Sequence, residues 1–146
     1  MRDPSASTDI PRRGVVAVIT RPHDAKLLII RRSERVRLAP GAYCFPGGGV
    51  EDGESEPVAL RRELIEELEL DVIVGRRVWE CVTPTNVDLA WWTANLRDAG
   101  AEPRPAPDEV SECHWLTIDE ILALPGLIAN NVDFLIAVQS GRVRLR

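Results

Sequence analysis

The sequence predicts an α/β domain in which a mixed β-sheet is covered by helices on both faces. Apolar, β-branched runs alternate with segments of helical periodicity in the order strand, strand, short strand, helix, strands, helix, helix. Such an order packs helices onto a mixed sheet. The length of 146 residues suffices for one domain with a sizeable core. Because no repeat, low-complexity tract or second domain is evident, we expect a single domain over residues 14–140.

The first third of the chain predicts three strands. Residues 1–13 lack periodicity and contain prolines and small polar residues, which is typical of a flexible tail. Residues 14–20 are almost entirely apolar and β-branched, which predicts a strand buried on both faces. A turn then leads to a returning strand over residues 26–32, and a loop leads to a short strand over residues 42–45.

A glycine-rich loop that begins at Gly47 leads into a predicted helix that ends near residue 70. Ser55 is a suitable N-cap for this helix. At 100° per residue, the helix places Glu63, Glu66 and Glu67 within an arc of about 100°. Apolar side chains fall on the opposite side, where we expect the helix to pack: Val58, Leu64, Ile65 and Leu68.

The clustered glutamates need a counter-charge, because like charges this close on a helix cost about a few tenths of a kcal/mol per pair. The neighbouring Arg62 and a bound divalent cation are the two candidates. Carboxylate oxygens suit Mg²⁺ and Mn²⁺, and the carbonyl groups of the preceding glycines can add further oxygen ligands. For such acids taken alone, a solvated acidic face without function is the alternative.

The second half of the chain predicts a β-hairpin. Residues 71–82 and 87–96 have strand character, and residues 83–86 break the pattern with turn-forming residues. Alternation puts Trp91 and Trp92 on opposite faces of the sheet. One of them belongs to the core, and the other either stacks on a nucleobase or packs against its neighbours.

The C-terminal part predicts a loop, a last strand and two helices. Residues 97–108 are rich in proline and form the loop, and residues 109–116 form the strand. Residues 117–120 are a capping box that opens a short helix. Asn130 or Asn131 caps a last amphipathic helix that runs to about residue 139, and residues 141–146 are expected to be a frayed tail.

The spacing around the acidic helix is similar to a known family signature. The chain reads Gly48-x5-Glu54-x7-Arg62-Glu63-Leu64-x-Glu66-Glu67. This resembles the signature of the Nudix hydrolases, and every fixed position matches except one, where Glu69 replaces a glycine. That glycine lies at the helix exit, so its loss concerns the end of the helix and not the ligand set. The resemblance implies the Nudix fold, an α/β/α sandwich, and Mg²⁺-dependent hydrolysis of a diphosphate linkage in a nucleoside diphosphate linked to another group.

The resemblance also implies a set of metal ligands. Glu63, Glu66 and Glu67 would hold Mg²⁺, or Mn²⁺ in its place, with Glu54 assisting. The carbonyl oxygen of Gly47 would be a further ligand in the arrangement of the family.

Two further residues receive roles from the same resemblance. Arg62 would orient the acids by ion pairing and would not touch the substrate. Family members often place a glutamate near the loop before the last strand, where Glu109 stands, as an extra metal ligand or as the base that activates water. Glu63 and Glu66 are the other candidates for this base.

The substrate is less well defined than the chemistry. Arg32 or Arg37 would meet phosphate groups, as arginines here do in the family, with ion pairing to neighbouring acids as the alternative. Trp92 is the candidate for stacking on a nucleobase. The run from Arg32 to Gly48 is similar to a pattern of the coenzyme A diphosphatases, although that subgroup has Leu-Leu-Thr before its first arginine. Nucleoside triphosphates, ADP-ribose, sugar nucleotides and dinucleoside polyphosphates stay open.

Composition excludes several classes of protein. A net charge of −5 argues against a surface that coats nucleic acid, and no apolar run reaches the length of a membrane span. The three cysteines lie far apart without a metal-binding spacing, which indicates a reducing compartment. We therefore expect a cytoplasmic enzyme for a nucleotide-type small molecule, without a nucleic-acid or membrane partner; a homodimer is common among relatives.

A non-catalytic Nudix-fold module that senses a nucleotide is the alternative of another class. Such modules usually lose one or more of the signature acids, and all of these acids are present here. The sequence therefore favours catalysis.

Overall fold

Strand β1 (Arg12–Ile19) is an inner strand of the larger of two sheets in the computed structural model, which describes residues 12–146. This sheet has the order β4-β1-β6-β5, and the other three strands are β4 (Gly47–Gly49), β6 (Val87–Leu96) and β5 (Val72–Val82). β1 runs parallel to β6 and antiparallel to β4, so the sheet is mixed. Residues 15–19 are buried on both faces, which confirms the prediction from their β-branched sequence.

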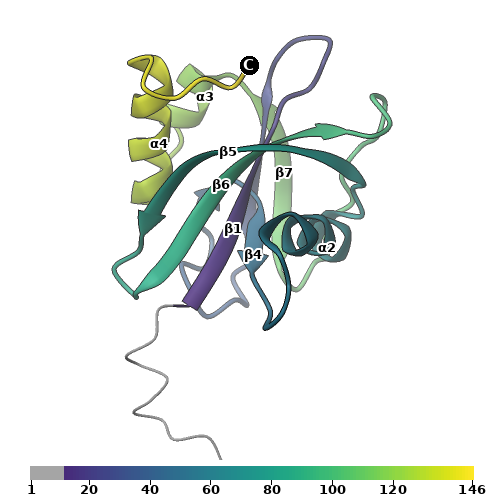
Figure 1. Cartoon of the computed structure of the whole chain (residues 1–146), viewed down its shortest axis with the longest axis vertical. Helices are drawn as coiled ribbons and strands as arrows, with labels where there is room; N and C mark the ends of the chain where they lie inside the picture. Colours follow the sequence, from purple (N-terminus) through teal and green to yellow (C-terminus); the bar gives the residue numbers. More distant parts are fainter. Residues whose placement is uncertain (1–11) are drawn as a thin grey trace, which may run out of the picture.

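A second sheet contains only antiparallel neighbours, in the order β3-β2-β7. It consists of β2 (Leu27–Arg32), β3 (Tyr43–Cys44) and β7 (Val110–Leu116). The sequence predicted one mixed sheet, whereas the structure divides the strands between two sheets (Figure 1). The predicted hairpin is confirmed, because β5 and β6 pair antiparallel on either side of residues 83–86.

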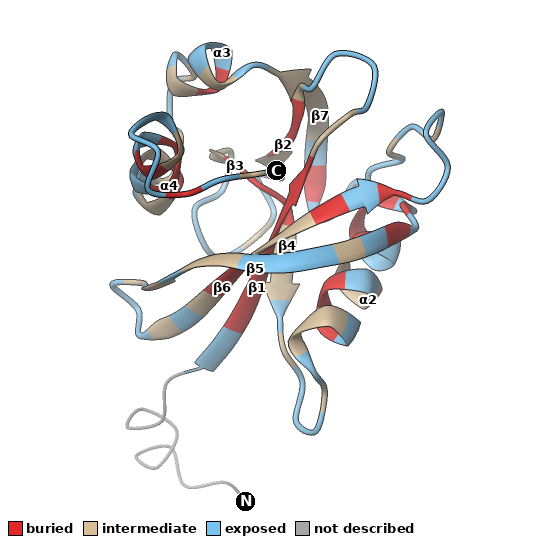
Figure 2. Ribbon diagram, turned by 45° about the horizontal axis from the view of Figure 1, so that its top comes forward, coloured by how far each residue is buried: buried red, intermediate tan, exposed pale blue. Residues whose placement is uncertain are grey.

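Helices cover the sheets from two sides, as the α/β prediction requires. Helix α2 (Glu56–Leu68) lies on one side, and α3 (Ile118–Leu122) and α4 (Ala129–Gln139) lie on the other (Figure 1). The buried residues gather along β1 and its neighbouring strands (Figure 2). Among residues 12–146, no helix is both long enough and apolar enough to cross a membrane.

The two faces of β1 belong to two separate hydrophobic clusters. Val15 and Ala17 pack in the cluster that contains the buried leucines of α2. Val16 and Val18 pack in the cluster that contains Phe134 of α4. Successive side chains of a strand point to opposite faces, so β1 contributes to the cluster of α2 on one face and to the cluster of α4 on the other. Burial of each large apolar side chain contributes about 1.5–3 kcal/mol to this packing.

The tryptophans of β6 follow the predicted alternation. Trp91 is fully buried and stacks on Phe134 at a centroid distance of 4.5 Å. Trp92 lies on the other face and packs at the edge of the cluster under α2. The prediction that one of the two belongs to the core is confirmed for Trp91.

The packed face of α2 differs from the prediction. Leu64 and Leu68 are buried as expected, but Val58 and Ile65 are 56% and 50% exposed, so their assignment to the packed face was wrong. Glu67 lies instead among the buried residues of the helix. The reason is that the helix is rotated so that its packed arc is centred near Glu67, and the two apolar side chains face solvent.

Three other predictions are corrected by the structure. Gly47, expected in a loop, begins strand β4, which pairs with β1. Helix α4 begins after Ile128 without a side-chain cap, because Asn131 is buried and accepts a hydrogen bond from the Phe45 N–H at 2.9 Å instead. Within the expected C-terminal tail, Val143 is buried in the cluster around α4, and its N–H donates to the Ala137 carbonyl oxygen. The predicted tail at the N-terminus concerns residues 1–11, which lie outside the described residues, and Arg12 and Arg13 belong to β1.

Helix α2 begins and ends with well-formed caps. The Ser55 side chain accepts a hydrogen bond from the Val58 N–H, as predicted for an N-cap. At the other end, Glu69 has a left-handed backbone with φ of 50°, and its N–H donates to the carbonyl oxygen of Ile65. The left-handed region favours glycine, so the glutamate is strained at this helix exit.

We predict that Glu69→Gly stabilises the protein. Glycine adopts the left-handed conformation without the steric cost of Cβ, so the free energy of unfolding should rise by about 0.5–1 kcal/mol. Urea unfolding followed by circular dichroism measures this change. The matched control is Arg61→Gly in the exposed helix interior, which should lose about 1 kcal/mol. A destabilised Glu69→Gly protein would contradict the assignment of strain to Glu69.

Candidate active site

Glycines allow strand β4 to lie directly against both β1 and α2. A Cβ atom at Gly48 would come within 2.2 Å of the carboxyl carbon of Glu63. A Cβ atom at Gly47 would come within 2.0 Å of the Val15 carbonyl oxygen. Real Cβ atoms essentially never show contacts below 3.0 Å. Gly48 therefore creates the space in which the Glu63 carboxylate lies, and Gly47 allows β4 to approach β1.

Arg62 connects the acids of the helix. Its guanidinium group binds Glu54 through two hydrogen bonds of 2.7 and 2.8 Å. It also donates to Glu63 at 3.0 Å, to Glu66 at 3.3 Å and to the Gly49 carbonyl oxygen at 2.9 Å. The hydrogen bonds from Arg62 lower the pKa of the Glu54 carboxyl group to about 2. Arg62 thus has the contacts expected of a residue that orients the acids.

Glu67 is a buried carboxylate without a full set of partners. Glu67 is only 7% exposed, and its Oε1 atom has no hydrogen-bond partner. Burial, followed by the nearby charges of Glu63 and Glu109, raises the pKa of Glu67 far above its ordinary value. Burial also raises the pKa of Glu63. Because an isolated buried charge is costly, this pair of acids attracts a proton or a cation.

Three other predicted residues, Glu66, Glu109 and Arg32, differ in their exposure and in their effect on this pair. Glu66 is 56% exposed on its side chain, and its contact with Arg62 is the longest of the Arg62 set of hydrogen bonds. Glu109 is exposed in the loop before β7, close enough to Glu67 to raise the pKa of Glu67. The charge of Arg32 lowers the pKa of Glu67, and the Arg32 Nε–H donates to the Leu38 carbonyl oxygen at 2.8 Å.

Among the described residues, two predicted substrate-binding residues, Arg37 and Trp92, make no hydrogen bond or ion pair with Glu63 or Glu67. Arg37 is exposed in the loop between β2 and β3. The indole Nε1–H of Trp92 donates to Glu56 at 2.8 Å, at the first turn of α2. Glu56 was not singled out from the sequence. A glutamate in the first turn of a helix is common, and nothing local indicates that Glu56 would contact distant strands.

The donors around Glu67 fit a hard divalent cation. Within residues 12–146, no three acid, histidine or cysteine side chains already converge as a metal cage, and Arg62 pairs with Glu54, Glu63 and Glu66 instead. However, the Glu67 Oε1 atom has no partner, a second carboxylate lies beside it, and the glycines of β4 leave room above the sheet. Oxygen donors of this kind are those that Mg²⁺ and Mn²⁺ prefer.

Comparison with known proteins assigns this chain to a family. A model of the Nudix domain matches residues 10–137. The chain therefore belongs to the Nudix family, as the resemblance of the helix signature implied.

Individual relatives agree with this assignment. The chain is 31% identical over 115 residues to the NAD-capped RNA hydrolase NudC of Stutzerimonas stutzeri, covering 76% of this chain and 38% of the relative. It is 35% identical over 135 residues to the m7GpppN-mRNA hydrolase NUDT17 of Danio rerio, covering 77% of this chain and 45% of the relative. The chain thus spans less than half the length of these two curated relatives.

A solved structure supports the fold independently. The crystal structure of the MutT protein from Methanosarcina mazei Go1 superposes with a TM-score of 0.76 at 24% identity, covering 90% of this chain and 94% of that one. The arrangement of strands and helices around α2 is therefore the Nudix fold.

We predict that Glu67→Gln stabilises the metal-free protein. The amide keeps the shape of the side chain but removes the cost of burying a carboxyl group that is ionised in the unfolded chain and must be protonated or remain charged in the folded protein, so the free energy of unfolding in EDTA at pH 8 should rise by about 1–3 kcal/mol. Because the pKa of Glu67 is raised in the folded state, its carboxylate lowers stability as the pH rises above the unfolded value of about 4.3. The gain should therefore shrink when unfolding is measured near pH 4.

The control for this prediction is the exposed neighbour Glu66. Glu66→Gln should change the free energy of unfolding by about 0.5 kcal/mol or less. If Glu67→Gln is instead less stable than wild type at pH 8, the carboxylate has a favourable partner in the folded protein and the account of its burial is wrong.

Proposed function

We propose that this chain hydrolyses a diphosphate linkage in a nucleoside diphosphate joined to a second group, with Mg²⁺ as its cofactor. The observation that carries the proposal is the unpartnered Oε1 atom of Glu67 beside the carboxylate of Glu63. Two neighbouring carboxylates away from solvent lower the stability of a protein that binds no cation there. A cation bound together with phosphate oxygens offsets that loss. Membership of the Nudix family supports the same reaction class.

Residues from two elements would hold the metal. Glu63, Glu66 and Glu67 of α2 are the principal ligands, Glu54 assists, and the carbonyl oxygen of Gly47 adds a backbone donor from β4. When bound, Mg²⁺ neutralises phosphate oxygens and stabilises the leaving oxygen, and Mn²⁺ can take its place.

Arg62 acts through the acids and not on the substrate. Its bidentate pair with Glu54 and its hydrogen bond to Glu63 restrict the rotamers of both acids. A planar guanidinium group with several donors suits this task better than the single ammonium group of a lysine. The ligands are therefore oriented before the cation arrives.

The base that removes a proton from the attacking water must be a carboxylate that can reach solvent. Glu66 and Glu109 are both exposed, whereas Glu63 is held by Arg62 close to Gly48. This difference favours Glu66 or Glu109 as the base and leaves Glu63 as a ligand.

The substrate would reach this site as an anion. Arg32 lies near Glu67 and uses one N–H on the Leu38 carbonyl oxygen, so its other N–H groups are candidates for phosphate contacts, together with exposed Arg37. Guanidinium groups bind phosphate oxygens in pairs. The net charge of −5 favours a small nucleotide over a long nucleic acid, although the names of NudC and NUDT17 describe capped RNA as the substrate of those relatives.

We predict that Glu66→Gln and Glu67→Gln lower kcat/KM by about 10²–10⁴-fold, because each removes a ligand or a base. The assay measures product release from a panel of nucleotide diphosphates in Mg²⁺: ADP-ribose, a sugar nucleotide, a dinucleoside polyphosphate, coenzyme A and a nucleoside triphosphate. Glu69→Gln, an exposed change on the same helix end, is the control and should retain wild-type turnover. A wild-type protein that is inert towards the whole panel, or a Glu67→Gln variant with full activity, would contradict the proposal.

A further inference from the structure

We propose that Glu56 is a positioning residue that clamps the first turn of α2 to three strands and so determines where the metal-binding acids of that helix lie. The inference rests on the proposed function, because the acids that it positions are those proposed to hold Mg²⁺. Glu56 itself is not proposed as a ligand.

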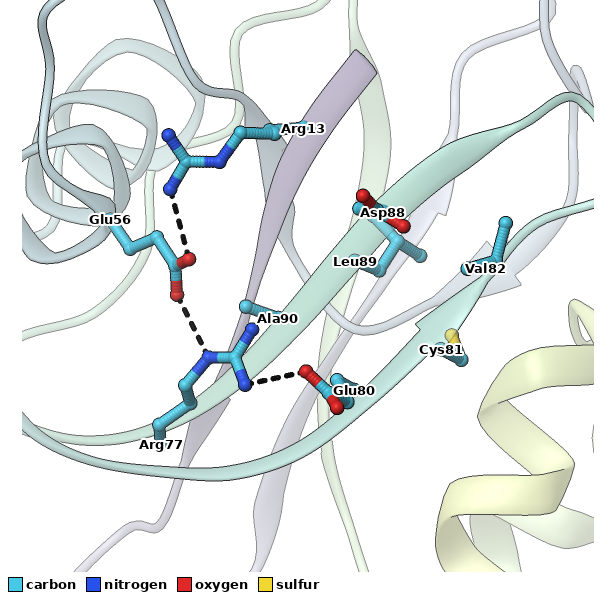
Figure 3. Close-up of a pocket in the computed structure, with 9 residues that line it drawn as sticks. All are labelled: Arg13, Glu56, Arg77, Glu80, Cys81, Val82, Asp88, Leu89 and Ala90. Atoms are coloured by element: carbon cyan, nitrogen blue, oxygen red, sulfur yellow. Dashed lines mark hydrogen bonds and ion pairs between the residues drawn. The ribbon is translucent and has the colours of Figure 1, made fainter. Parts of the chain in front are cut away.

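The clamp consists of one carboxylate and three donors from β1, β5 and β6. The Glu56 Oε1 atom accepts hydrogen bonds from the Trp92 indole N–H at 2.8 Å and from the Arg77 Nε–H at 3.1 Å. The Oε2 atom accepts a hydrogen bond from Arg13 at 3.0 Å. Figure 3 shows Arg13 and Arg77 approaching the carboxylate from two different strands. The Glu56 side chain is 18% exposed, so these contacts are partly shielded from solvent.

The contacts of Glu56 add directional hydrogen bonds to the apolar packing of α2, which begins at the fully buried residues Ala59 and Leu60. A hollow of about 430 Å³ opens beside the clamp and is lined by the charged side chains of the clamp and by residues of β5 and β6. Apolar packing resists separation of a helix from a sheet but resists small rotations weakly, since it is non-directional. Charge-assisted hydrogen bonds to three separate strands resist both movements.

Rotation of α2 matters because Glu56 shares a helix face with the acid pair. Glu63 and Glu67 follow Glu56 by seven and eleven residues, which places all three within about 20° of one direction on the helix. Side chains end about 6 Å from the helix axis, so a rotation of about 10° would move each carboxylate by about 1 Å. Errors of this size at a catalytic centre can cost about 10²-fold in rate. Fixing the first turn therefore fixes the position of Glu63 above Gly48 and of Glu67 two turns or more beyond the clamp.

The same geometry assigns a task to Trp92. Its ring packs at the edge of the cluster under α2, and its only polar atom is taken up by Glu56. Trp92 is therefore a second positioning residue. If its ring stacked on a nucleobase, as considered from the sequence, its indole N–H would not be free to donate to the base, because Glu56 already accepts it.

The test is the affinity of the metal-free protein for Mn²⁺, measured by titration calorimetry, with thermal unfolding measured on the same samples. Glu56→Gln keeps the shape of the side chain but replaces one acceptor oxygen by an amide donor that faces an arginine. We expect Mn²⁺ to bind about three- to tenfold more weakly to this variant at a temperature where the protein is fully folded. A purely structural role would lower the unfolding temperature and leave the affinity of the folded protein unchanged.

Two further variants sharpen the test. Trp92→Phe removes only the indole donor and should weaken Mn²⁺ binding in the same direction, and the double variant should lose less than the sum of the two single effects. The control is Asp88→Asn. Asp88 lines the same hollow without a contact to Glu56 in the described structure, so this variant should bind Mn²⁺ as wild type does.

The outcomes separate this proposal from the proposed function. If the folded Glu56→Gln and Trp92→Phe proteins bind Mn²⁺ with wild-type affinity, the clamp does not position the acids and the inference is overturned. If the Mn²⁺ affinities change as expected but wild-type protein hydrolyses none of the nucleotide panel, the clamp stands and the proposed reaction fails.

Discussion

Two carboxylates between helix α2 and the strands beneath it, buried Glu67 and half-buried Glu63, constrain much of this structure. An unpaired carboxylate in a protein interior costs several kcal/mol, so Glu63 and Glu67 can lie there only with room, partners and a source of positive charge. Gly48 provides the room, because any side chain at this position would collide with Glu63. Arg62 provides a partner for Glu63, whereas one oxygen of Glu67 has none. The missing partner is what makes the helix suitable for a divalent cation.

The helix accepts this arrangement at a cost in stability that other contacts offset. Two apolar side chains, Val58 and Ile65, face solvent so that the acids can face the strands. The buried leucines of α2 attach the helix to β1, and the contacts of Glu56 attach its first turn to the sheet. If Glu67 holds a cation as proposed, stability and function oppose each other at this residue, which is typical of sites that concentrate charge before their ligand binds.

Local sequence patterns predicted most of the fold and the identity of the candidate site. The buried strand β1, the hairpin through residues 83–86 and the capping box of α3 are all encoded by neighbouring residues, and the structure confirms them. The glutamate spacing identified α2 as the candidate metal-binding helix. The rotation of α2 could not be predicted, because apolar residues occur on both sides of the helix and the deciding factor is the space left by distant glycines. The contacts of Asn131 with Phe45 and of Glu56 with Trp92 also join residues far apart in the sequence, where no periodicity reports them.

The most direct test of this account is anomalous diffraction from crystals of the wild-type protein grown with Mn²⁺. The account predicts an anomalous peak at about 2.0–2.3 Å from an oxygen of Glu67, with an oxygen of Glu63 or Glu66 as a second ligand. The guanidinium group of Arg62 should remain paired with Glu54 in that structure. A map with no peak near Glu67, or with Mn²⁺ bound only at other acids of the surface, would contradict the claim that this buried carboxylate exists to hold a cation.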